Sequence, residues 1–136
     1  MTTYVLDASA VLRYINNEAG GVRVGEILVD GVLQRAQLCV SAVQWGEIAG
    51  KLRKSLGAGN EGKIMHELLL SGLDIISVDA DCSVRAARLK VDRKISYADA
   101  FAVDLAMRSP EYVLVTADYD FKAVEDLAKI EFLPAK

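Results

Sequence analysis

The fold of this chain is decided near its start by the stretch Tyr4-Val5-Leu6-Asp7-Ala8-Ser9-Ala10-Val11-Leu12. Its first three residues form a continuous apolar run, and similar runs recur at 38–40, 73–78 and 112–115. Consecutive apolar residues, rather than alternating ones, are typical of strands that are buried on both faces, as in a parallel sheet. Each run is therefore predicted to be a strand of a mainly parallel sheet.

Between these runs the apolar residues recur with the 3.6-residue period of a helix. This spacing predicts helices within 24–32, 45–56 and 98–105. Strands that alternate with helices are joined by right-handed crossovers that place helices on both faces of the sheet. The expected fold class is α/β, a three-layer α/β/α sandwich around a central, mainly parallel sheet of four or five strands.

The composition is that of a globular protein: 52% of the 136 residues are apolar and 26% are charged. No repeat or linker divides the chain, so we expect a single domain over residues 1–136. No run approaches the roughly 18 apolar residues of a membrane span, and the N-terminus lacks the basic start of a secretory signal. Cys39 and Cys82 lie far apart among apolar neighbours, which predicts buried free thiols in a cytoplasmic protein.

The net charge of −3 does not exclude a nucleic-acid partner. A nucleic-acid-binding surface is usually basic. However, the charge becomes +1 once four metal-binding carboxylates are set aside, and bound cations would add positive charge at the site. The net charge therefore says little about whether the chain binds nucleic acid.

Two acidic residues follow predicted strands. Asp7 comes directly after the first run, and Asp118 follows the last run after Thr116 and Ala117. Ligands of an open parallel sheet bind beyond the carboxyl ends of its strands. Neighbouring carboxylates repel one another unless a cation neutralises them, and oxygen ligands favour hard ions such as Mg²⁺ or Mn²⁺. Asp7 and Asp118 are therefore candidate metal ligands.

Two further acids lie on predicted helices. On the helix within 98–105, Asp99 flanks the apolar stripe, whereas Asp104 falls on the far side and is expected to face solvent. Glu47 lies opposite the apolar stripe of its own helix, which suits an inward ligand only if this second face also covers something. The small residues Gly46 and Gly50 would permit such a close approach.

Each acid also has a purely structural interpretation. Asp7 and Asp118 are suited to cap the helices that follow them. Glu47 is suited to an exposed i, i+4 pair with Lys51, and its spacing alone favours this surface role.

Two stretches carry the pattern of a capping box, in which a hydroxyl and a side chain three residues later satisfy the first amides of a helix. They are Ser41 with Gln44 and Ser96 with Asp99. On this pattern alone, Asp99 is as well suited to capping as to metal binding.

Four stretches taken together resemble the PIN domain family. In chain order they are residues 4–12, residues 41–48 with Glu47, Tyr97-Ala98-Asp99-Ala100-Phe101-Ala102, and Thr116-Ala117-Asp118-Tyr119-Asp120-Phe121. The last two are the most specific, since the final stretch matches the family's T-x-D-x-D-F signature. They span essentially the whole chain, which most resembles the VapC-type toxins of prokaryotic toxin–antitoxin pairs.

The resemblance implies an endoribonuclease that uses Mg²⁺ or Mn²⁺, forms a homodimer and is held inactive by an antitoxin encoded beside it. The residues that match the family's catalytic metal ligands, here called the acidic quartet, are Asp7, Glu47, Asp99 and Asp118. Those that match its supporting polar positions are Ser9, Thr116 and Asp120. The two hydroxyls would orient carboxylates or bound water.

A cation held by the acidic quartet would activate a water molecule that attacks the RNA phosphodiester and leaves a 5′-phosphate and a 3′-hydroxyl. His66 is the only histidine, which excludes a ribonuclease built on two histidines. Lys51 and Lys54 are candidates for contacting phosphates, and Tyr97 and Tyr119 for stacking on unpaired bases. A solvated helix face and rim packing explain the same residues at least equally well.

The N-terminal half also offers a partner surface. Tyr14, Ile15 and the apolar segment 22–33 carry more hydrophobic area than one small sheet needs. An antitoxin segment or a second copy of the chain is expected to cover it.

Three other functions compete with this interpretation. A haloacid dehalogenase-type phosphatase needs a second aspartate two residues after Asp7, where this chain has Ser9. A phospho-receiver domain needs adjacent acids after its first strand, and Asp7 stands alone there. A degenerate PIN-like scaffold that binds RNA or protein without cleavage is disfavoured by an intact acidic quartet.

Overall fold

The computed structural model describes residues 1–135, so Lys136, the last residue of the predicted domain, lies outside it. Five strands form one sheet in the order β3-β2-β1-β4-β5, and every neighbouring pair is parallel. They are β1 (Thr2–Leu6), β2 (Ala36–Ser41), β3 (Asp74–Ile76), β4 (Tyr112–Thr116) and β5 (Lys129–Phe132). The four predicted strands are confirmed. The fifth, β5, is a short edge strand whose apolar residues alternate with charged ones, so it lacks a continuous apolar run.

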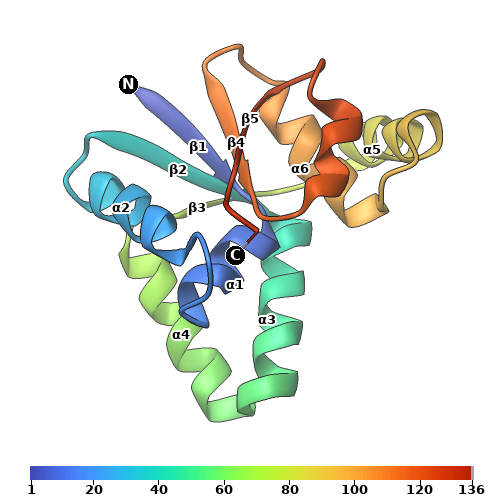
Figure 1. Ribbon diagram of the computed structural model, residues 1–136. Coiled ribbons are helices and arrows are strands. Elements are labelled where there is room, and N and C mark those ends of the chain that lie inside the picture. Colours follow the sequence, from blue (N-terminus) through green and yellow to red (C-terminus); the bar gives the residue numbers. More distant parts are fainter. Residues whose placement is uncertain (136) are drawn as a thin grey trace.

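Helices cover both faces of this sheet (Figure 1). They are α1 (Ala8–Ile15), α2 (Gly21–Val32), α3 (Ala42–Leu56), α4 (Ala58–Leu70), α5 (Ala80–Arg93) and α6 (Tyr97–Ala106), with a 3₁₀ helix η1 (Tyr119–Val124). Within β1, Leu6 joins the apolar cluster of α1 to α4, whereas its neighbour Val5 joins the cluster of α5, α6 and η1. Successive strand residues thus enter opposite cores, which confirms the predicted three-layer sandwich.

The order of the strands creates a switch point between β1 and β4. From β1 the chain proceeds to β2 and β3 on one side, and it later returns to form β4 and β5 on the other. Leu6 pairs with Val115, so β1 and β4 end side by side while their connections diverge. Ligands of open parallel sheets bind at such a switch point, beyond the carboxyl ends of the strands. The fold therefore places its candidate site after Leu6 and Thr116.

The prediction that Asp104 faces solvent is wrong. Its side chain is buried between α5 and α6, where the carboxylate accepts hydrogen bonds from Arg85 Nε at 2.8 Å and from Cys82 Sγ at 3.2 Å. Burial by itself raises the pKa of Asp104, but these hydrogen bonds bring it below its usual value. The helical wheel failed because every residue from Ala100 to Ala106 is buried, so this part of α6 has no solvent face.

The close approach that Gly46 and Gly50 would permit does not occur within residues 1–135. A Cβ atom placed on either glycine would meet no atom there within 4 Å apart from its own stretch of helix. This face of α3 is therefore open over both glycines. No helix in the described part of the chain is long and apolar enough to cross a membrane.

Candidate active site

Asp7 is the most deeply buried acid at the switch point. It is 2% exposed and caps α1, because its Oδ1 accepts a hydrogen bond from the Ala10 amide at 2.9 Å. The same carboxylate accepts the Ser9 hydroxyl at 2.8 Å and the Thr116 hydroxyl at 2.6 Å. Burial raises the pKa of Asp7 to about 6, although these hydrogen bonds act against the rise. The capping role is confirmed, but within residues 1–135 no Lys or Arg forms an ion pair with this buried carboxylate.

Thr116 ties the ends of β1 and β4 together. Its fully buried hydroxyl donates to Asp7 and accepts the Asp118 amide at 2.9 Å. Ser9 completes the link, because its oxygen accepts the Ala117 amide at 2.9 Å. The Asp118 carboxylate caps η1 by accepting the amide of Asp120 at 2.9 Å. The supporting positions Ser9 and Thr116 therefore hold the segments that carry Asp7 and Asp118.

Asp99 and Glu47 reach the same edge of the sheet from α6 and α3. Asp99 is half-buried in the first turn of α6, where its amide donates to Ser96 Oγ at 3.1 Å. Burial raises the pKa of Asp99, and the nearby carboxylates of Asp118 and Glu47 raise it further against the lowering effect of hydrogen bonds. Asp99 in turn acts on the pKa of Asp7. The four acids are thus electrostatic neighbours.

Gln44 is a site residue whose role the sequence did not reveal. Ser41 caps α3 as predicted, with its Oγ accepting the amide of Val43, but the reciprocal half of the capping box is wrong because the Gln44 side chain points away to other elements. Gln44 Oε1 accepts the Ala8 amide and Nε2 donates to the Ala98 carbonyl, each at 2.7 Å. These partners are 36 and 54 residues away in the chain, so no local pattern signals the contacts.

The donor set suits a hard divalent cation. It consists of carboxylate and hydroxyl oxygens, and within residues 1–135 no Lys or Arg forms an ion pair with a member of the acidic quartet. Within residues 1–135, no three His, Cys, Asp or Glu side chains lie close enough together to hold a metal ion. Mutual repulsion keeps neighbouring carboxylates apart until a cation neutralises them.

The candidate RNA-contacting residues have mixed surroundings. Lys51 and Lys54 are exposed on α3. The ring of Tyr97 packs edge-on against Phe101, and its hydroxyl donates to a backbone carbonyl at 3.4 Å. The Tyr119 hydroxyl donates to a second carbonyl at 2.8 Å. Both tyrosines remain about two-fifths exposed, so rim packing leaves part of each ring free.

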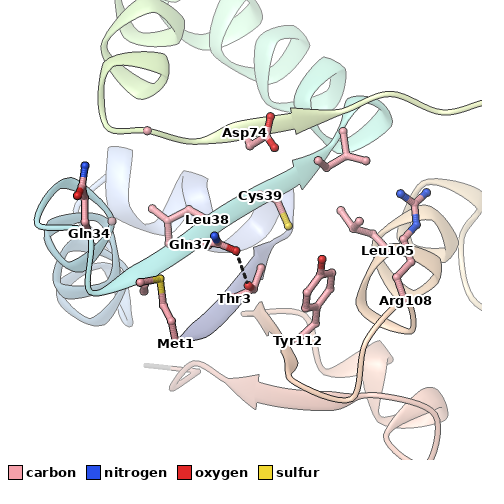
Figure 2. A pocket seen from close by; sticks show the side chains of 14 residues that line it. Met1, Thr3, Gln34, Gln37, Leu38, Cys39, Asp74, Leu105, Arg108 and Tyr112 are labelled. Atoms are coloured by element: carbon pink, nitrogen blue, oxygen red, sulfur yellow. Dashed lines mark hydrogen bonds between the residues drawn. The ribbon is translucent and has the colours of Figure 1, made fainter.

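A separate hollow lies at the opposite edge of the sheet (Figure 2). It encloses about 540 Å³ at the amino ends of the strands and contains the hydrogen bond from Thr3 Oγ1 to Gln37 Oε1 at 3.2 Å. No member of the acidic quartet lines it. The acids therefore gather at the carboxyl edge, which is where an open parallel sheet binds ligands.

Comparisons with known proteins agree with this fold. VapBC2 from Rickettsia felis, solved with a DNA fragment from its promoter, matches with a TM-score of 0.70 and 20% identity over 97% of this chain and 99% of that one. VapBC-1 from nontypeable Haemophilus influenzae gives 0.69 and 18%, over 96% and 97%. The sarcin–ricin loop-cleaving toxin VapC20 from Mycobacterium tuberculosis gives 0.71 and 17%, over 89% and 94%.

At these identities the solved structures establish a common fold. No curated relative matches significantly. The PIN domain family model, however, matches residues 4–127, which is nearly the whole chain and includes every member of the acidic quartet. The chain therefore belongs to the PIN domain family.

Proposed function

We propose that the protein is a metal-dependent endoribonuclease and the toxin of a toxin–antitoxin pair. The observation that carries this proposal is the placement of the acidic quartet. Asp7 and Asp118 follow β1 and β4 at the switch point of a PIN domain. Burial and neighbouring carboxylates raise the pKa values of Asp7 and Asp99, and within residues 1–135 no Lys or Arg forms an ion pair with the quartet. Such a charge arrangement favours a bound Mg²⁺ or Mn²⁺.

The acidic quartet would hold the cation, which supplies the Lewis acidity that activates water and stabilises charge on the phosphate. Ser9 and Thr116 orient the Asp7 carboxylate by donating to its oxygens. Thr116 also fixes the backbone of Asp118. Lys51 and Lys54 supply positive charge to the RNA backbone, and the exposed parts of Tyr97 and Tyr119 supply stacking surfaces.

Asp99→Asn is expected to lower RNA cleavage by at least about a hundredfold, because it removes one negative ligand while keeping the shape of the side chain. Total RNA is incubated with Mg²⁺ or with EDTA, and the new ends are sequenced. Wild-type protein should create 5′-phosphate ends only with Mg²⁺. Cleavage that persists in EDTA, or that the variant performs at the wild-type rate, would contradict the proposal and favour a scaffold that binds RNA or protein without cutting.

The second part of the proposal concerns an antitoxin. An apolar groove of about 620 Å³ runs between α2, the end of α1 and α4. Its apolar lining includes Tyr14, Ile15, Val29, Val32, Leu33 and Ile64. Val32 is 61% exposed and Leu33 is 52% exposed, so this is apolar surface without cover in the single chain. A toxin–antitoxin complex from Klebsiella pneumoniae shares this fold, with a TM-score of 0.63 and 19% identity, which supports an antitoxin segment with apolar side chains as the occupant.

Val29→Asp is expected to weaken antitoxin binding by at least tenfold, because it places a charge in an apolar groove that the partner must desolvate. The measurement is co-purification and calorimetry with the antitoxin encoded beside the gene. Val91→Asp is the matched control, since Val91 is 74% exposed on α5, away from the groove. Equal binding by the two variants would contradict this location, and RNA cleavage should be unchanged in both.

We also propose a homodimer in the cytoplasm. The dimer follows from the family resemblance and is checked by light scattering of the purified protein. A reducing compartment suits the two cysteines, which are both free and buried.

A further inference from the structure

Gln44 occupies an unusual position for a polar side chain. It is 1% exposed, in the first turn of α3, and its amide group reaches two other helices. Gln44 Oε1 accepts the Ala8 amide at 2.7 Å, and Nε2 donates to the Ala98 carbonyl at 2.7 Å. Nε2 also lies 3.5 Å from Asp99 Oδ1. One buried side chain thus connects α1, α3 and α6.

The two partners need a side chain that both accepts and donates a hydrogen bond, which an amide does. The Ala8 amide is a donor, so it needs an acceptor, whereas the Ala98 carbonyl needs a donor. A carboxylate offers acceptors only, and an aliphatic side chain offers neither. The two partners also determine the orientation of the Gln44 amide, with Oε1 toward Ala8 and Nε2 toward Ala98. Buried polar groups of this kind are costly to leave without partners, which holds the three helices in one relative arrangement.

A member of the acidic quartet lies on or directly before each of the three helices that Gln44 connects. Ala8 directly follows Asp7, and Ala98 directly precedes Asp99. Glu47 lies three residues after Gln44, close to one turn further along α3. The fourth member, Asp118, is held separately through the hydroxyl of Thr116.

We propose that Gln44 is a positioning residue for the acidic quartet. Its amide sets the spacing of Asp7, Glu47 and Asp99, so that the carboxylates can converge on one divalent cation. This inference rests on the proposed metal-dependent function. It assigns to Gln44 no contact with RNA and no proton transfer.

The test compares two buried substitutions on α3. Gln44→Met keeps the length of the side chain and removes both hydrogen bonds. Ile48→Ala, one turn further along, destabilises the same helix from the apolar core without touching the bridge. Mn²⁺ binding is measured by calorimetry on the complete chain without RNA. We expect Gln44→Met to raise the Mn²⁺ Kd at least tenfold and Ile48→Ala to leave it within twofold of wild type, at a temperature where both variants are folded.

Cleavage assays supply a second measurement. Gln44→Met should lower kcat and raise the Mg²⁺ concentration for half-maximal activity, with the KM for RNA unchanged. Gln44→Asn keeps the amide on a shorter stem that cannot span both partners, so it should also weaken Mn²⁺ binding, and it replaces the methionine variant if that one fails to fold.

The outcomes separate the two proposals. Wild-type affinity for Mn²⁺ in the folded Gln44 variants, or equal weakening in Ile48→Ala, overturns the positioning role. If wild-type protein binds Mn²⁺ but cleaves no RNA, the proposed ribonuclease function fails while the Mn²⁺ measurements still decide the role of Gln44. If wild-type protein binds no Mn²⁺, both proposals are overturned.

Discussion

Asp7→Asn is expected to stabilise the metal-free protein at pH 7 by up to about 3 kcal/mol while abolishing RNA cleavage. Burial raises the pKa of Asp7 from 3.8 in the unfolded chain to about 6 in the fold. Each pKa unit corresponds to about 1.4 kcal/mol. The neutral asparagine avoids this cost and remains a good helix cap. The acid is therefore retained against the stability of the fold, as expected of a functional group.

The raised pKa of Asp7 makes the free energy of unfolding of wild type depend on pH. Because the folded state binds the Asp7 proton more tightly than the unfolded chain, the contribution of Asp7 to stability is present below about pH 4 and is lost as the pH rises to about 6. Urea unfolding in EDTA should show that the variant and wild type have similar stability below about pH 4, diverge between about pH 4 and 6, and differ by a constant amount above that.

The control is Asp92→Asn, which removes one negative charge from an exposed position on α5. A gain of similar size in this control would attribute the effect to net charge rather than to burial. If Asp7→Asn is less stable than wild type at pH 7 in EDTA, the buried carboxylate does not destabilise the fold. Mg²⁺ should stabilise wild type and leave Asp7→Asn unchanged, because only wild type keeps the full set of ligands.

Thr116→Val is expected to lower the free energy of unfolding by about 1.5–3 kcal/mol at pH 7. Valine has the same shape and suits a buried strand, but it removes the hydroxyl that donates to Asp7 at 2.6 Å and accepts the Asp118 amide at 2.9 Å. The loss should be smaller at pH 5, where a protonated Asp7 no longer needs this donor. RNA cleavage should fall at least tenfold, since both flanking acids lose a fixed orientation.

Thr3→Val is the matched substitution for this experiment. Thr3 is also a buried threonine of the central sheet, but its hydroxyl donates to the neutral Gln37 at the opposite edge (Figure 2). It should cost about 1 kcal/mol and leave cleavage unchanged. If the two variants behave alike, Thr116 has no special role at the acidic edge.

Local patterns in the sequence were sufficient for the strands and for two of the acids. A continuous apolar run identifies a strand buried on both faces, and an acid directly after it must lie at the carboxyl edge, so Asp7 and Asp118 could be placed from spacing alone. The capping interpretation of both residues is also confirmed, and it is compatible with a position at this edge. For Glu47, helix spacing alone favoured the surface, and only the family resemblance assigned it to the quartet.

The errors share one physical cause. A helical wheel describes one helix with one buried face, whereas α6 is enclosed by the sheet and α5, so Asp104 is buried in a contact with Arg85. The capping pattern at Ser41 describes neighbours in the chain, whereas Gln44 bonds to partners on two other helices. Gly46 and Gly50 were expected to permit close packing, but small size permits an approach without supplying a partner.

The amino-acid sequence alone determined the layered α/β class and the position of Asp7 and Asp118 after strands, because these follow from the periods of strand and helix. The tertiary structure decided how the acids are held. Thr116 reaches Asp7 across 109 residues, and Gln44 joins α1 to α6, only because the order of the strands brings their ends together. The burial that raises the pKa of Asp7 likewise arises from packing against distant segments, which no local pattern encodes.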